Sequence, residues 1–190
     1  MEIFSSCFYE EEIKEFINTS TPTEKYNLQL YKAEESAGWV NFYFKYNEDE
    51  FRILITLAAY DLRELIFFLE NIIDLKDEAI IFLENELIST PLLYVSPIDK
   101  EKIRFFVADE ERICDLLESD QIEEDNLKGI FDYDIRCDVI IKKKNLLKQF
   151  YRAIKNIINN CEVYNEHIYD IRYIAWKNNL KNIISYLKKE

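Results

Sequence analysis

Over several stretches of this chain, every second residue is apolar and the residues between are mostly polar. A period of two is typical of half-buried β-strands. It is clearest over 39–46, where Val40, Phe42 and Phe44 share one face. The predicted strands span residues 26–33, 39–46, 50–58, 79–84, 91–96, 102–108 and 130–141.

Other segments place apolar residues three and four positions apart, which is the spacing of a helix with one buried face. Over 62–74 this stripe contains Leu62, Leu65 and Leu69, and Asp61 stands where a helix N-cap is expected. The predicted helices span residues 9–17, 62–74, 143–159 and 178–188, with a short helix near 113–117.

The order of these elements predicts the fold class. Turn residues at Glu35–Gly38 and Asn47–Asp49 predict hairpins, and hairpins make antiparallel pairs. A run of strands, one helix, further strands and then helices predicts an α+β fold. We expect one α+β domain over residues 1–190, with a single antiparallel sheet of about six strands and amphipathic helices packed on one face.

Charge is unevenly distributed along the 190 residues, whose formal net charge is -13. Residues 1–141 form an acidic body with 33 Asp and Glu against 13 Lys and Arg, a difference of -20. Residues 142–190 form a basic helical end with 4 acidic and 11 basic residues, a difference of +7. The acidic body predicts attraction to a basic protein and argues against direct binding of nucleic acid.

Three short acidic runs are the candidate contacts for a basic partner. Aromatic residues stand between such runs, and aromatic side chains commonly anchor protein interfaces. The runs are Glu10, Glu11 and Glu12; Asp109, Glu110 and Glu111; and Glu123, Glu124 and Asp125.

Cysteine spacing and the N-terminus predict a cytoplasmic protein. Cys7, Cys114, Cys137 and Cys161 are too widely spaced for a close-pair metal motif. The start at Met1-Glu2-Ile3 lacks the basic and apolar regions of a signal peptide, so we expect reduced thiols.

The longest uncharged apolar stretch, near 53–60, is about half of a membrane span, so no membrane association is expected. A homo-oligomer is possible because apolar strand faces serve a dimer as well as a core.

Scarcity of glycine and histidine argues against several enzyme classes. Gly38 and Gly129 alone do not build a phosphate-binding loop, a dinucleotide fingerprint or a nucleophile elbow. The single histidine, His167, follows Glu166 and is either a general base oriented by that carboxylate or a boundary residue. One histidine and four scattered cysteines do not predict zinc, and no cofactor is expected.

Asp132, Asp134 and Asp138 form the candidate metal site. Strict alternation over 130–141 places them with Arg136 on one strand face, where two carboxylates two residues apart can hold magnesium. The simpler interpretation is a solvated face with an Asp–Arg cross-pair. Glu84 and Glu86 are a second pair of the same kind. Cys137 falls on the apolar face, which favours a core thiol over a nucleophile.

Lys142, Lys143 and Lys144 open the predicted helix at 143–159. Lysines at a helix N-terminus are electrostatically unfavourable, which suggests contact with a phosphate or an acidic partner. Solvation between strand and helix is the simpler explanation.

The strand and amphipathic helix over Phe131–Ile158, followed by Tyr173-x-x-Trp176 and the stripe from Leu180 to Leu187, resemble small acidic α+β immunity-type proteins of bacterial toxin loci. The resemblance covers about a third of the chain and implies no transferable catalytic residue.

The first functional hypothesis is a non-catalytic, immunity-like binding protein that neutralises or regulates a basic partner protein. One alternative is a metal-dependent hydrolase or nuclease that uses Asp132 and Asp134. Two others are a nucleic-acid-mimic inhibitor of phage origin and an accessory protein whose charge only secures solubility.

Overall fold

The computed structural model describes residues 7–24, 27–36, 39–56, 61–83, 89–111, 132–160 and 180–189. Its elements, in chain order, are α1 (Cys7–Thr19), β1 (Leu28–Ser36), β2 (Trp39–Tyr46), β3 (Asp49–Thr56), α2 (Asp61–Ile73), β4 (Ala79–Phe82), β5 (Ser89–Pro97), β6 (Lys102–Glu111), β7 (Asp132–Lys142) and α3 (Lys143–Asn160). A C-terminal helix follows, described over 180–188. No helix in the described ranges is long and apolar enough to cross a membrane.

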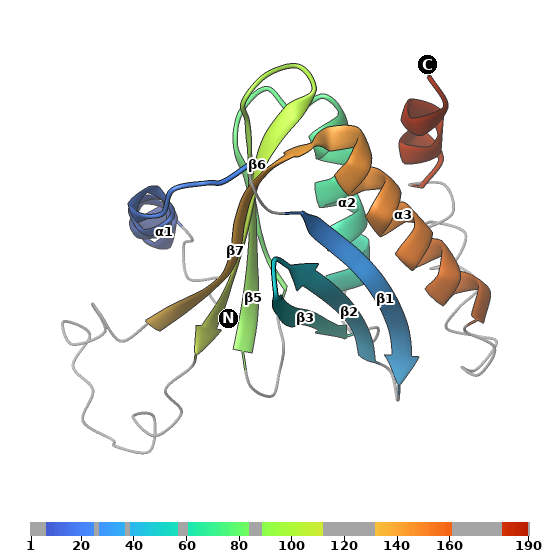
Figure 1. Ribbon diagram of the computed structural model, residues 1–190, viewed down its shortest axis with the longest axis horizontal. Coiled ribbons are helices and arrows are strands. Elements are labelled where there is room, and N and C mark those ends of the chain that lie inside the picture. The colour runs from blue at the N-terminus through green and yellow to red at the C-terminus, as the bar shows by residue number, and fades with distance from the viewer. Residues whose placement is uncertain are drawn as a thin grey trace.

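The strands form two antiparallel sheets, one of three strands in the order β1-β2-β3 and one of four in the order β4-β5-β6-β7 (Figure 1). The α+β class is confirmed, whereas the expected single sheet of about six strands is wrong. β2 and β3 are joined by a short turn at Asn47, whose φ of 59° suits a tight turn. The chain passes from β3 to β4 through α2 instead, and this helical connection starts the second sheet.

The main core fills the space between the two sheets, α2, α3 and the C-terminal helix. The ring centres of Phe42 and Phe44 in β2 lie 5.9 and 5.7 Å from the ring centre of Phe150 in α3. The ring centre of Phe105 in β6 lies 6.3 Å from the same point. All four rings are fully buried. Phe150 of α3 thus contacts both sheets. Burial of one Phe side chain contributes about 1.5–3 kcal/mol to the stability of the fold.

Helix α1 packs on the opposite face of the four-stranded sheet, so the expectation that the helices share one face is wrong (Figure 1). Ile13 and Ile17 of α1 are buried against Tyr94, Phe106 and their neighbours on β5 and β6. The centres of β5 and β6 are apolar on both faces, and each apolar face requires cover. Alternation shows which residues share a face but not which helix covers it.

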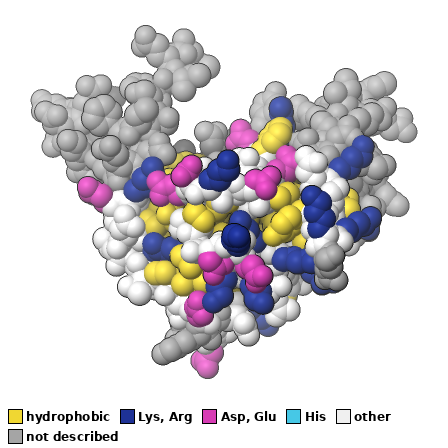
Figure 2. All heavy atoms as spheres, turned by 90° about the horizontal axis from the view of Figure 1, so that it is seen from above, with side chains coloured by type: hydrophobic (Ala, Val, Ile, Leu, Met, Phe, Trp, Pro, Cys, Tyr) yellow, Lys and Arg dark blue, Asp and Glu magenta, His cyan; other side chains and the backbone are white. Residues whose placement is uncertain are grey.

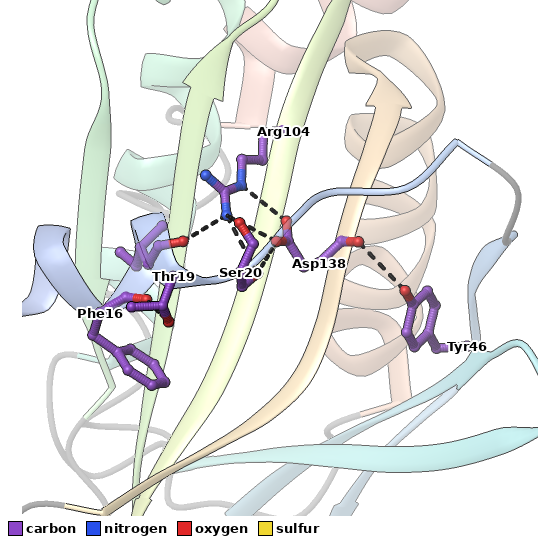
Figure 3. Close-up of polar contacts among 7 residues, drawn as sticks. Phe16, Thr19, Ser20, Tyr46, Arg104 and Asp138 are labelled. Atoms are coloured by element: carbon purple, nitrogen blue, oxygen red, sulfur yellow. Dashed lines mark hydrogen bonds and ion pairs between the residues drawn. The ribbon is translucent and has the colours of Figure 1, made fainter.

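A buried ion pair joins α1 to this sheet. Arg104 of β6 binds Asp138 of β7 through two hydrogen bonds, Nε to Oδ1 at 2.9 Å and Nη2 to Oδ2 at 2.8 Å (Figure 3). The Arg104 and Asp138 side chains are only 10% and 7% exposed. The guanidinium group lies 6.0 Å from the ring centres of both Tyr94 and Phe106. The ion pair is therefore largely desolvated and lies beside two aromatic rings.

The same arginine stabilises the C-terminal end of α1. Its Nη2 donates to the carbonyl oxygens of Ile17 at 2.7 Å and Ser20 at 3.1 Å, and the last turn of α1 has no basic residue of its own. A cation near the last carbonyls of a helix complements the helix dipole. Ser20 also donates its hydroxyl to Asp138, so the end of the helix contacts both partners of the ion pair (Figure 3).

The segment after α1 then runs along the edge of β7. Thr23 donates its N–H to the Asp138 carbonyl at 3.2 Å, and Ile140 donates its N–H to the Thr23 carbonyl at 3.0 Å. The Tyr46 hydroxyl of the other sheet donates to the same Asp138 carbonyl at 3.3 Å. Asp138 therefore connects α1, its following segment and both sheets through one residue.

Replacement of Asp138 by alanine is expected to destabilise the fold by about 3–5 kcal/mol, because it leaves the Arg104 cation buried without a counter-ion. Urea unfolding at pH 7 measures this. Asp134→Ala on the same strand is the matched control, since the Asp134 side chain is 53% exposed and its ion pair is worth about 0–1 kcal/mol. Similar losses in the two variants would contradict a dominant role for the ion pair.

Candidate binding surfaces

A β-bulge shapes the outer face of the three-stranded sheet. The pairing of β1 with β2 skips one residue between Leu30 and Lys32, which leaves Tyr31 without a partner across the strand. A bulge turns two consecutive side chains toward one side. Tyr31 and Lys32 consequently both join the solvent face, and Tyr31 is 40% exposed.

Two clusters of the same composition lie side by side on this face. In the first, the Tyr43 hydroxyl donates to Glu34 at 2.7 Å, and the Lys32 ammonium pairs with Glu34 at 2.6 Å. The same ammonium lies 5.0 Å from the centre of the Tyr43 ring. A carboxylate and an aromatic ring thus hold one cation together.

The second cluster repeats this arrangement with Tyr31, Lys45 and Glu50. The Tyr31 hydroxyl donates to Glu50 at 2.9 Å, Lys45 pairs with Glu50 at 2.9 Å, and the Lys45 ammonium lies 5.0 Å from the Tyr31 ring centre. The rings of the two clusters are 6.3 Å apart. We call these six residues the tyrosine face; they are Tyr31, Lys32, Glu34, Tyr43, Lys45 and Glu50.

These contacts shift the ionisation of all six groups in the direction that favours the pairs. The bond from Lys32 lowers the pKa of Glu34, and the bond from Lys45 lowers the pKa of Glu50. The same bonds raise the pKa of each lysine. Hydrogen bonds to Glu50 and Glu34 raise the pKa of Tyr31 and Tyr43, respectively. The carboxylates therefore stay ionised over a wider range of pH than free carboxylates.

A basic groove lies beside α3. Its first hollow, of about 440 Å³, is lined by β7, by the N-terminal half of α3, and by Glu24, Asn27 and Leu28. Lys142 lines this hollow, whereas Lys143 is buried at 6% exposure and donates its N–H to the Glu101 carbonyl. Lys144 lies outside the lining. The structure thus separates the three consecutive lysines into different surroundings.

A second bulge overturns the expected alternation of β7. Val107 of β6 pairs with Cys137, but the next residue, Ala108, pairs with Ile135, so Arg136 is the extra residue. Asp138 faces the α1 side of the sheet opposite Phe106, whereas Asp134 pairs with Asp109 on the other side. The expectation that Asp134 and Asp138 share one strand face is therefore wrong. A one-residue insertion reverses the faces beyond it.

The carboxylates of the proposed metal site contact arginines in this structure. Arg136 Nη1 lies 2.7 Å from Asp134, and its Nε lies 2.6 Å from Asp109. Asp138 binds Arg104, and the side chain of Asp132 is outside the described part. Among described residues, no group of three or more His, Cys, Asp or Glu side chains is placed to hold a metal. Asp134 and Arg136 pair within β7, whereas the Arg136–Asp109 and Arg104–Asp138 pairs join β7 to β6.

The other predicted contact residues are described only in part. Glu10, Glu11 and Glu12 lie in α1, and Glu110 and Glu111 lie at the end of β6, but their side chains are outside the described part. Asp109 is buried at 8% exposure against Arg136. The predictions for Glu84, Glu86, Cys114, Glu123, Glu124, Asp125, Cys161 and His167 fall outside the described residues.

Cys137 lies in the main core at 1% exposure and is not in a disulfide. Burial, followed by the neighbouring Asp138, raises the pKa of its thiol well above the ordinary value. The thiolate is the reactive form of cysteine, so this thiol is chemically inert in the folded chain. The sequence pattern had favoured a core position for it.

Sequence reasoning missed the tyrosine face and the basic groove. Both depend on residues brought together from distant positions, since Tyr31 bonds Glu50, and Lys102 and Arg152 line one hollow, only in the fold. One signal was present in the sequence. Asn145, Lys148, Gln149, Arg152 and Asn156 follow helical spacing and form a polar stripe beside the buried face of α3.

Comparison of the chain with protein-family models, with curated proteins and with solved structures gives no match in any of the three.

The carboxylates of the tyrosine face give a pH-dependent contribution to stability. The pKa values of the Glu34 and Glu50 carboxyls are lowered in the folded state. Their contribution to the free energy of unfolding is therefore complete above the unfolded pKa of about 4.3, and it is lost as the pH falls through the folded pKa. Glu34→Gln/Glu50→Gln is therefore expected to be less stable than the unmodified chain at pH 7. Urea unfolding between about pH 5 and pH 2 should show this difference vanish. A difference independent of pH would contradict the assignment.

The Cys137 thiol is expected to be unreactive in the native chain. In a Cys7→Ser/Cys114→Ser/Cys161→Ser variant, a thiol-specific chromogenic disulfide reagent should label no thiol until denaturant unfolds the protein. Reaction of the folded variant at the rate of a free thiol would show that Cys137 is accessible.

Proposed function

We propose that this protein is a non-catalytic binding protein that neutralises or regulates a basic partner protein, in the manner of an immunity protein. The tyrosine face is the proposed contact surface. The observation that carries the proposal is the repeated cluster in which a tyrosine ring and a glutamate hold one lysine ammonium.

The chemistry of these clusters suits lysine and arginine side chains of a partner. An aromatic face attracts a cation through its quadrupole, and an oriented carboxylate adds a charge-assisted hydrogen bond. Lys32 and Lys45 already occupy this kind of position within the chain. Both ammonium groups are about half exposed, so an incoming cation competes with a solvated lysine side chain that is free to swing away.

The overall charge supports the same conclusion. A net charge of -13 attracts a basic protein over distances of about a Debye length and raises its association rate by roughly 10–10³-fold at low salt. Tyrosine is enriched among residues that dominate binding energy, and Tyr31 and Tyr43 are adjacent. Long-range charge thus selects the partner, and the tyrosine face supplies the local contacts.

The test compares two variants of the full chain in affinity purification from the host lysate at low and high salt. Tyr43→Ala/Glu50→Gln alters both clusters. Glu64→Gln/Phe67→Ala is the matched control, since Phe67 is an exposed aromatic of α2 with Arg63 5.2 Å from its ring centre. We expect a stoichiometric basic partner that is lost at high salt, with recovery at least about fivefold lower for the first variant only.

Equal recovery by the two variants would remove the tyrosine face from the proposal. If no basic protein co-purified at either salt concentration, the proposed function itself would be wrong.

A further inference from the structure

The basic groove extends along about three turns of α3. A second hollow, of about 420 Å³, continues from the first along β1 and shares Gln149 and Arg152 with it. The polar stripe from Asn145 to Asn156 follows the groove, and the eleven helical rises between these two residues span about 16 Å. Figure 2 shows the side on which β7 passes into α3, where Lys and Arg side chains lie among hydrophobic and acidic ones.

Positive charge dominates the first hollow. Four cations line it, namely Lys102, Lys142, Lys148 and Arg152, against Glu24 as its one carboxylate. Lys102 pairs with Glu24 at 2.9 Å. Lys142, Lys148 and Arg152 are exposed, and their side chains form no ion pair or hydrogen bond with any residue in the described ranges. Three cations in one groove are therefore available to an anion.

These cations are placed where they weaken the fold. Lys148 and Arg152 are four residues apart on α3, and like charges at this spacing destabilise a helix by about 0.2–0.5 kcal/mol. An anionic ligand in the groove would offset the repulsion between Lys148 and Arg152.

The shape of the groove favours an extended chain over a compact ion. Gln149 accepts a hydrogen bond from the Leu30 N–H at 2.5 Å and donates to the Leu28 carbonyl at 3.3 Å, so it contacts the edge of β1 midway along the groove. β1 is an edge strand of its sheet, and residues 29–33 line the second hollow. A length of about 16 Å accommodates about five residues of extended peptide at about 3.3 Å each.

We propose that the groove between α3 and the strands β1 and β7 binds an extended acidic peptide segment of a partner protein. Lys142, Lys148 and Arg152 pair with its carboxylates, while Asn145 offers an amide group along its path. A nucleic acid is the less favoured occupant, since the net charge of -13 repels a polyphosphate chain. Of the tyrosine face, Tyr31 and Lys32 also line this groove. The groove favours anionic groups, whereas the tyrosine face favours cationic ones.

The test uses a fluorescein-labelled six-residue peptide of alternating Glu and Ser, titrated with the full chain by fluorescence polarisation. Lys148→Gln/Arg152→Gln is expected to weaken binding by about tenfold or more. The matched control, Lys76→Gln/Lys100→Gln, removes two exposed lysines that do not line the groove and should change affinity by less than about twofold.

A second readout separates binding from folding. Since Lys148 and Arg152 repel each other, the groove variant is expected to unfold at the same temperature as the unmodified chain or a higher one, even as it loses the peptide. Equal affinity in the groove and control variants would overturn the proposal. Tighter binding of a single-stranded oligonucleotide of equal charge, lost in the groove variant, would overturn it in favour of nucleic acid.

Discussion

The buried pair of Arg104 and Asp138 is the contact on which the arrangement of the other elements depends. It places a cation at the carbonyl end of α1 and a carboxylate on the edge strand β7, and it lies beside two aromatic rings. Desolvation makes such a pair costly to form and far more costly to break on one side. Specific placement of α1, rather than a large net gain in stability, is therefore its main effect. Ile13 and Ile17 pack on the second apolar face of β5 and β6, and the ion pair adds a polar contact at the end of the same helix.

Two β-bulges determine which charges reach solvent. The bulge at Tyr31 puts tyrosine and lysine together on the outer face of one sheet, and the bulge at Arg136 places one arginine between two aspartates on the other. In both strands the extra residue contacts a carboxylate. Bulges often occur where a strand re-aims a side chain toward a functional surface. Tyr31 and Lys32, at the bulge of the edge strand β1, belong to the tyrosine face and also line the basic groove. The two surfaces therefore meet at these residues.

Much of the fold was predictable, because period two and period 3.6 are imposed by backbone geometry and by burial. Seven strand segments and the helices 62–74 and 143–159 lie close to their predicted positions. The division into two sheets was not predictable, since the pattern of a strand does not reveal its neighbour. The faces of Asp134 and Asp138 were misassigned because strict alternation contains no sign of an inserted residue at Arg136. The clusters of the tyrosine face escaped detection for a related reason, as Glu34, Tyr43 and Glu50 come from three different strands.

We propose that surfaces of opposite preference for charge lie on the two sides of β1. The most direct test is to follow the backbone amide signals of the full chain by nuclear magnetic resonance during two separate titrations, one with a short oligolysine peptide and one with a short oligoglutamate peptide. Oligolysine is expected to shift the signals of β1–β3 around Tyr43 and Glu50, and oligoglutamate those of α3 between Asn145 and Asn156. If both peptides shifted the same residues, or if the shifts were spread evenly over the chain, the two surfaces would not exist as described.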